Sequence, residues 1–89
     1  DIYAVMHCLA EKGITRLLVE GGAGIAAAFL RADLVDRIAW FRAPGIIGGD
    51  GISAVAAYGL AQLHDMQRFD PVSCERFGND WLETYWRWD

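Results

Sequence analysis

Residues 17–30 read LLVEGGAGIAAAFL. The apolar run Leu17–Val19 predicts a short buried strand, the glycines that follow end it, and residues 24–30 predict a tightly packed helix. The first N–H groups of a helix lack intrahelical acceptors, and the helix dipole places partial positive charge there. Because Gly21 and Gly22 carry no Cβ, a phosphate can approach this backbone closely. The stretch therefore predicts an anion site, although an ordinary tight turn explains the same local pattern equally well.

Glu20 stands at the carboxyl end of this predicted strand, where open α/β sheets place their ligands. Gly22, Gly24 and Ala27 also fit the dinucleotide-binding pattern G-x-G-x-x-A. In a Rossmann domain, Arg42 at the end of the next predicted strand would receive the 2′-phosphate of NADP. The end of the chain opposes this alternative, because it predicts an antiparallel hairpin where a Rossmann half would continue with a helix and a parallel strand.

Before and after the glycines, the pattern predicts an α/β fold with parallel strands and flanking helices. Asp1 caps a predicted helix, Ile2–Glu11, which has an apolar face at helical spacing and ends before Gly13. Strands are predicted over residues 15–20 and 37–43, the second apolar on both faces as in a central parallel strand. We expect these two strands to be parallel neighbours. The glycine-rich residues 45–51 predict either a mobile connection or a loop over a ligand or subunit interface.

The C-terminal part predicts a hairpin of residues 67–77 and 81–88 around a turn at Gly78–Asp80. Pro71 cannot donate a hydrogen bond to a neighbouring strand, so the first of these strands is expected to lie at a sheet edge or to carry a bulge.

Composition limits the partners of the chain. Its 89 residues carry a net charge of −4 and a single lysine, which argues against nucleic acid, and no apolar run is long enough to cross a membrane. The cysteines and histidines (Cys8, Cys74, His7 and His64) lack metal-ligand spacing and indicate a reduced, cytoplasmic protein without a metal.

Hydrophobic residues make up 54% of the chain, more than so short a chain can bury. We therefore expect a segment of a larger domain, an oligomer, or both.

Four blocks in order carry a resemblance to a known family. They are LLVEGG at 17–22, AFLRADLVD at 28–36, AP at 43–44 and IGGDG at 47–51. Together they resemble the reductase domain of the bifunctional riboflavin-biosynthesis deaminase/reductase. The resemblance implies a partial dihydrofolate-reductase-like fold, with the chain as one segment from the C-terminal part of that domain and without the deaminase domain. It also implies a homodimer and NADPH-dependent reduction of 5-amino-6-(5-phosphoribosylamino)uracil to the ribitylamino product.

Matching the family's motif residue by residue implies two sets of contacts. Glu20 would contact the substrate. The NADP site would be lined by Gly22, Ala23, Gly24, Ile25, Ala26, Ala27 and Ala28. The family usually has Pro-Thr where this chain has Ala23–Gly24, so the backbone must replace a hydroxyl donor to the phosphate. The residues name no catalytic acid.

Two alternatives remain open. The chain is a non-catalytic half-domain for nucleotide binding or oligomerisation, or it belongs to another dihydrofolate-reductase-like enzyme that reduces a different substrate with NADPH. The sequence preceding Asp1 would discriminate between them, because a deaminase motif there indicates the riboflavin pathway.

Overall fold

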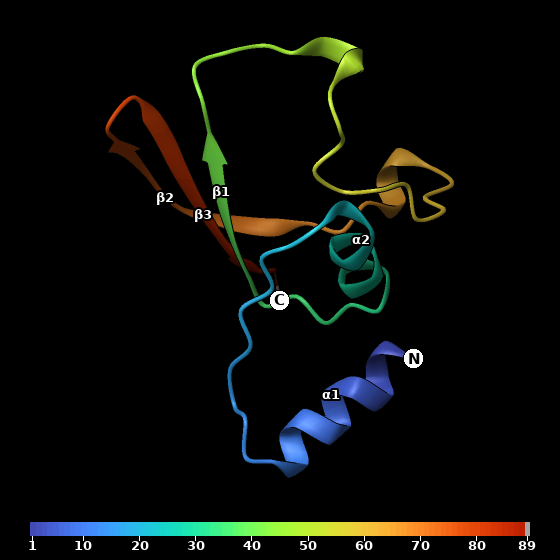
Figure 1. Ribbon diagram of the computed structural model, residues 1–89. Coiled ribbons are helices and arrows are strands. Elements are labelled where there is room, and N and C mark those ends of the chain that lie inside the picture. Colours follow the sequence, from blue (N-terminus) through green and yellow to red (C-terminus); the bar gives the residue numbers. More distant parts are fainter. Residues whose placement is uncertain (89) are drawn as a thin grey trace. The chain divides into compact units, whose positions relative to one another are not determined.

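Both predicted helices are present in the computed structural model, which describes residues 1–88 (Figure 1). Helix α1 spans Ile2–Glu11, and the Asp1 carboxylate accepts the N–H of Tyr3 at 2.9 Å as the N-cap. After α1, the N–H groups of Gly13 and Ile14 donate back to the last turn, and Gly13 has a φ of +86°. This is the left-handed helix stop for which glycine is favoured, so the predicted end of the first helix is confirmed.

Helix α2 spans Ala23–Arg31 and ends in the same way. The N–H groups of Asp33 and Leu34 donate to the carbonyls of Leu30 and Phe29, both at 3.1 Å. Asp33 has a φ of +57°, a conformation that aspartate tolerates better than most side chains.

The described residues form two structural units. The first contains residues 1–34 and 53–60, with both α-helices. The second contains residues 35–52 and 61–88 and holds strands β1 (Arg37–Arg42), β2 (Phe69–Phe77) and β3 (Asp80–Arg87). It also holds two 3-10 turns, η1 (Gly48–Asp50) and η2 (Leu63–Asp65).

The three strands of the second unit form an antiparallel sheet in the order β1-β3-β2. The predicted hairpin is confirmed as β2 and β3, joined by the two-residue loop Gly78–Asn79. Gly78 has a φ of +61°, the positive value that a tight hairpin turn requires at its first loop residue. Strand β2 lies at the sheet edge and its register shifts between Pro71 and Ser73. Both consequences predicted from Pro71 are therefore present.

The expectation of two parallel neighbouring strands is wrong for the described residues. Residues 14–22 form no strand and run as an extended, exposed segment. Strand β1 is present but pairs antiparallel with β3, at the edge of the sheet and not at its centre. A strand exists only through hydrogen bonds to a neighbour, and no described strand pairs with residues 15–20. An apolar run shows that a segment suits burial without showing which strand will lie beside it.

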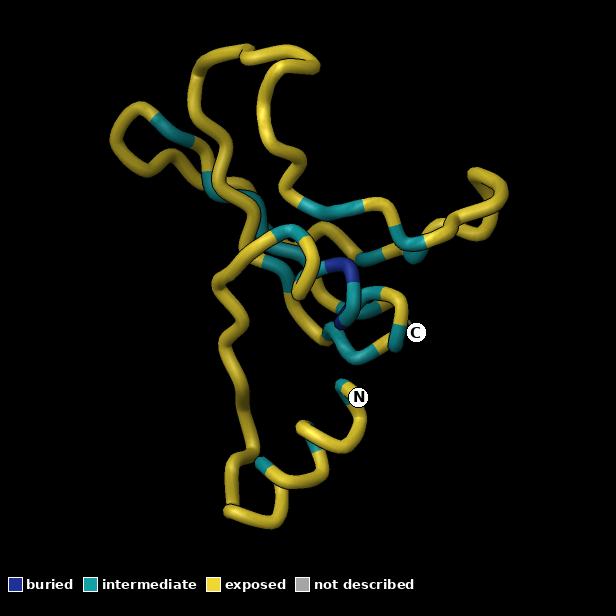
Figure 2. Tube along the Cα trace, turned by 45° about the vertical axis from the view of Figure 1, so that its right-hand side comes forward, coloured by how far each residue is buried: buried dark blue, intermediate teal, exposed yellow. Residues whose placement is uncertain are grey.

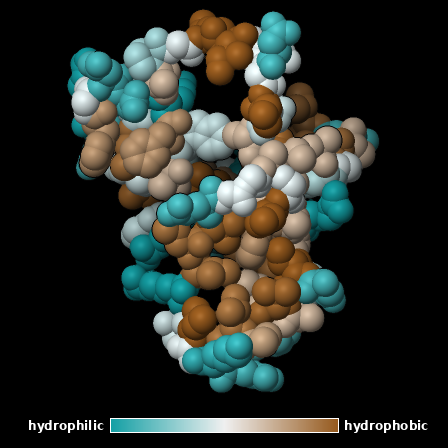
Figure 3. All heavy atoms as spheres, in the orientation of Figure 1, coloured by the Kyte–Doolittle hydropathy of each residue, from teal (hydrophilic) through white to brown (hydrophobic). Residues whose placement is uncertain are grey.

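Very little of the described chain is buried, as Figure 2 shows. Among residues 1–88, the buried side chains are those of Ala27 and Phe29 on α2, which are 4% and 8% exposed. Apolar side chains remain on the surface, as the brown spheres of Figure 3 show. The most exposed are Leu18, Ile46, Ile47, Ile52 and Leu63. Within residues 1–88, no helix is both long and apolar enough to span a membrane.

Candidate functional site

The candidate site is the N-terminal turn of α2. Gly22 is its N-cap, with a φ of +44°, and no side chain caps this end of the helix. The first helical hydrogen bond runs from the N–H of Ala26 to the carbonyl of Gly22, at 3.1 Å. The N–H groups of Ala23, Gly24 and Ile25 precede that bond and find no acceptor among the described residues. The turn therefore presents consecutive unpaired donors at the positive end of the helix dipole.

The glycines of this turn are uncrowded on the side where a side chain would stand. A Cβ added to Gly21, Gly22 or Gly24 would meet no other atom within 4 Å. The positive φ of Gly22 is a backbone conformation that side-chain-bearing residues rarely adopt. Unpaired amides, a glycine backbone and an uncapped helix suit an anionic group such as a pyrophosphate. The residues present thus fit the phosphate part of a dinucleotide.

The seven residues expected to line a cofactor site differ in what they offer. Gly22 to Ile25 form the first turn, and Gly24 and Ile25 are exposed. Ala26 and Ala28 lie further along the helix and are half-buried. Ala27 is only 4% exposed, so its side chain packs inside the protein. The donors are therefore concentrated in Gly22–Ile25.

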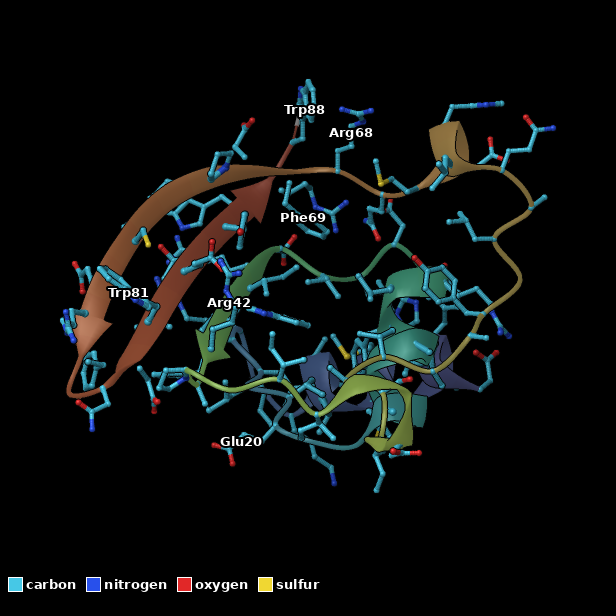
Figure 4. The ribbon with its side chains drawn as sticks, turned by 90° about the horizontal axis from the view of Figure 1, so that it is seen from above. Glu20, Arg42, Arg68, Phe69, Trp81 and Trp88 are labelled. Carbon is cyan, nitrogen blue, oxygen red and sulfur yellow. The ribbon has the colours of Figure 1, made fainter. Side chains whose placement is uncertain are left out.

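Glu20 lies two residues before this turn, in the extended segment that precedes α2. Its side chain is exposed, and no hydrogen bond or ion pair holds it among the described residues. Figure 4 shows its carboxylate pointing away from the ribbon. Glu20 is therefore accessible, and it would need substrate or further polypeptide to fix its position.

Arg42, the residue considered for a 2′-phosphate, is at the end of β1 as expected. Its guanidinium donates to Glu83 on β3 at 2.8 Å. After β1 the chain leads to an antiparallel hairpin and not to a further helix and parallel strand. The Rossmann alternative is therefore wrong, since its fold requires that continuation.

The connection between β1 and β2 contributes contacts to α2 that the sequence did not predict. Within the first unit, the N–H of Ala56 donates to the carbonyl of Ala23 at 3.1 Å, and Arg31 Nε donates to the carbonyl of Tyr58 at 3.3 Å. Residues 53–58 read SAVAAY, a run of small residues before an aromatic one. That composition permits close packing on a helix, but by itself it does not identify which helix.

A metal centre is not built by residues 1–88, because no three His, Cys, Asp or Glu side chains gather in a ligating cluster there. Cys8 and Cys74 are both exposed and unpaired thiols.

Comparison with known families identifies the chain. The model of the RibD C-terminal domain family matches residues 1–82. The chain belongs to that family. The resemblance inferred from the four sequence blocks is thereby confirmed.

Similar proteins include the riboflavin biosynthesis protein RibD of Mycobacterium tuberculosis. It is 36% identical over 78 residues, which are 88% of this chain and 22% of the relative. The 2,5-diamino-6-ribosylamino-4(3H)-pyrimidinone 5′-phosphate reductase of Methanothermobacter thermautotrophicus is 30% identical over 86 residues, 96% of this chain and 40% of the relative. The chain therefore spans well under half of the length of either relative.

The fold is shared with Acinetobacter baumannii RibD. Its form 1 matches with a TM-score of 0.73 at 22% identity, over 81% of this chain and 20% of that structure. Form 2 matches with a TM-score of 0.71 at 23% identity, over 78% of this chain and 19% of that structure. The α/β class and the dihydrofolate-reductase-like fold expected from the sequence are supported.

Proposed function

We propose that this chain is the C-terminal part of a reductase domain in a longer enzyme of riboflavin biosynthesis. The observation that carries the proposal is the open glycine turn of α2 in a member of the RibD C-terminal domain family. The whole enzyme would reduce the ribosyl group of 5-amino-6-(5-phosphoribosylamino)uracil to the ribityl chain. The zinc deaminase domain would lie elsewhere in the enzyme or in another protein.

The cofactor in this proposal is NADPH, which supplies the hydride when bound. This chain's part is to hold the cofactor. The N–H groups from Gly22 to Ile25 would bind the pyrophosphate, since they are unpaired and open to approach. Ala23 and Gly24 provide no side-chain hydroxyl, so the backbone supplies all the hydrogen bonds from this turn.

The substrate contact in this proposal is Glu20. Its exposed carboxylate can accept hydrogen bonds from ribose hydroxyl groups. It lies two residues before the proposed pyrophosphate site, so a substrate held there would lie near the cofactor.

A second substrate has specific support. Two relatives, from Methanothermobacter thermautotrophicus and Aquifex aeolicus, are named for reduction of 2,5-diamino-6-ribosylamino-4(3H)-pyrimidinone 5′-phosphate. That compound keeps an amino group at position 2, where the uracil substrate has an oxygen. The two candidates therefore differ in whether deamination precedes reduction.

A homodimer is the proposed assembly of the whole enzyme. Large aromatic side chains on the sheet, among them Phe41 at 59% and Trp86 at 49% exposure, are left for the rest of the domain and a partner subunit to cover. Light scattering of the full-length protein at micromolar concentration would give twice the monomer mass. A monomer at that concentration would contradict the proposed assembly.

The experiment that tests the function is NADPH oxidation by the full-length protein with each pyrimidine phosphate in turn. We expect turnover with the uracil compound and a lower kcat/KM with its 2-amino counterpart. A higher kcat/KM with the 2-amino compound would instead identify that compound as the substrate. NADPH binding without turnover of either would favour another reductase, and no NADPH binding would contradict the proposal in favour of a non-catalytic module.

A further inference from the structure

The long connection between β1 and β2 returns to α2 at one place. Residues 43–54 are all exposed, whereas Val55, Ala56 and Tyr58 are half-buried. At this place, two hydrogen bonds tie the connection to the helix. Ala56 N–H donates to the carbonyl of Ala23, and Arg31 Nε donates to the carbonyl of Tyr58. Residues 53–58, here called the strap, thus contact α2 by specific bonds within a single structural unit.

The two bonds involve the two ends of the helix. Ala23 is the first residue of α2 and Arg31 is the last, so they are separated by about 12 Å of helix axis. Side chains on a helix incline toward its N-terminus, so the long Arg31 side chain extends back along α2 to reach Tyr58. The strap therefore spans the helix with Ala56 at its first turn. Figure 1 shows this segment, in yellow, beside α2.

The Ala56 bond matters because, apart from the helix's own hydrogen bonds, no other hydrogen bond among the described residues holds the first turn of α2. Gly21, Gly22 and Gly24 surround the turn, and each glycine allows its backbone more conformations than another residue would. No side chain caps the helix, so no serine, threonine or aspartate holds the leading amides in place. The Ala23 carbonyl accepts the bond from the strap and shares its planar peptide group with the N–H of Gly24, which is one of the unpaired donors.

We infer that the strap positions the cofactor-binding turn, with Ala56 as the positioning residue. By holding the Ala23 carbonyl, Ala56 keeps the first turn of α2, with the amides of Ala23, Gly24 and Ile25, in its helical conformation before a dinucleotide arrives. This inference rests on the proposed function, since it assigns the strap to the same anion site. A preorganised site binds more tightly because less conformational freedom is lost on binding. The strap therefore contributes to dinucleotide affinity without touching the ligand.

The test compares the full-length wild-type protein with two variants. Ala56→Pro removes the N–H that reaches Ala23, and Arg31→Met removes the donor to Tyr58 while keeping a helix-forming, unbranched side chain. Calorimetric titration with NADP+ should show a Kd raised about 3- to 10-fold in Ala56→Pro, as expected for losing one hydrogen bond. Arg31→Met should raise it less. Since both release the same strap, their combined effect should be smaller than the product of the separate effects.

Hydrogen exchange without ligand supplies a second readout. The amides of Ala26 and Ala27, in the turn that the strap holds, should exchange faster in Ala56→Pro. The KM for NADPH should rise while the KM for the pyrimidine phosphate stays within about 2-fold, a separation that general loss of structure does not produce. Ala54→Pro is the matched control, since Ala54 is exposed, its N–H has no acceptor among the described residues, and a proline there restricts Ser53 and not Ala56; its Kd should stay at the wild-type value.

The outcomes separate this inference from the proposed function. Wild-type protein that fails to bind NADP+ contradicts the proposed function, and unchanged exchange at Ala26 and Ala27 in Ala56→Pro then also contradicts the strap. If the wild-type protein binds NADP+ and folded Ala56→Pro binds it with the same Kd, the inference about the strap is overturned and the proposed function stands. If Ala56→Pro does not fold, Arg31→Met decides: an unchanged Kd and unchanged exchange in that variant overturn the inference.

Discussion

The guanidinium of Arg42 lies 2.8 Å from the carboxylate of Glu83, joining the end of β1 to the central strand β3. The other carboxylate oxygen of Glu83 accepts the Tyr85 hydroxyl at 3.2 Å. Arg42 is 63% exposed at its side chain and Glu83 only 20%. The pair therefore places a partly desolvated carboxylate on the sheet with two donors to satisfy it.

Replacing Arg42 by methionine should lower the free energy of unfolding by no more than about 1 kcal/mol, because the arginine is mostly in water. Urea denaturation of the full-length protein measures this change. Arg16→Met is the control, since Arg16 is exposed without a described partner and should have no measurable effect. NADPH affinity should stay at the wild-type value in Arg42→Met, and a large loss would restore the phosphate-binding role considered for Arg42.

Tyr85 should titrate above its ordinary value. Partial burial raises the pKa of its phenol, and the hydrogen bond and negative charge of Glu83 raise that pKa further. As the pH climbs past about 10, the unfolded chain loses this proton first, so the stability contributed by Tyr85 declines from there through the raised pKa. Tyrosinate absorbance of wild type minus Tyr85→Phe gives the pKa. Glu83→Gln should lower it, and an unchanged value in Glu83→Gln would contradict the assigned contact.

The hairpin loop should depend on Gly78. Its φ of +61° is one that alanine adopts only with strain, so Gly78→Ala should lower the free energy of unfolding by about 1 kcal/mol. Gly49→Ala serves as the control, because Gly49 has no positive φ and a Cβ there meets nothing within 4 Å. Equal stability of the two variants in thermal denaturation would argue against the observed turn.

Glu20→Gln should impair use of the substrate without weakening binding of the cofactor. The amide removes the negative charge without changing the side chain's size, so kcat/KM for the pyrimidine phosphate should decrease while the Kd for NADPH stays within about 3-fold. Steady-state kinetics gives kcat/KM for the pyrimidine phosphate, and titration of the same preparation with NADPH gives the Kd. A wild-type kcat/KM in Glu20→Gln would remove Glu20 from the substrate site.

Local signals in the sequence predicted the helices and the hairpin well. The Asp1 cap, the glycine at position 13 and the turn at Gly78 each act within a few residues, and each is found where the pattern indicated. The effect of Pro71 is also local, because proline lacks an N–H to donate whichever strand lies beside it.

Long-range pairing could not be predicted in the same way. The run Leu17–Val19 indicated burial but not a partner, and in the described residues it pairs with no strand. The contact of Ala56 with Ala23 joins residues 33 positions apart through backbone atoms, which leave no trace in residue identity. The unpaired amides of the proposed anion site follow from local sequence, because Gly21, Gly22 and Gly24 lie within four residues at the start of α2.

If the amides at the start of α2 bind the NADPH pyrophosphate as proposed, Gly22→Val should obstruct that binding. Valine at Gly22 places a branched side chain in the open space before the helix and strains a φ of +44°. Gly13→Val is the matched control, because Gly13 also has a positive φ and open surroundings but lies at the end of α1.

The measurement is titration of the full-length wild-type, Gly22→Val and Gly13→Val proteins with NADPH, after circular dichroism has shown that all three are folded. Loss of two charge-assisted hydrogen bonds predicts a Kd raised roughly 100-fold or more in Gly22→Val, and a Kd near wild type in Gly13→Val. A folded Gly22→Val protein that binds NADPH as tightly as wild type would contradict the account.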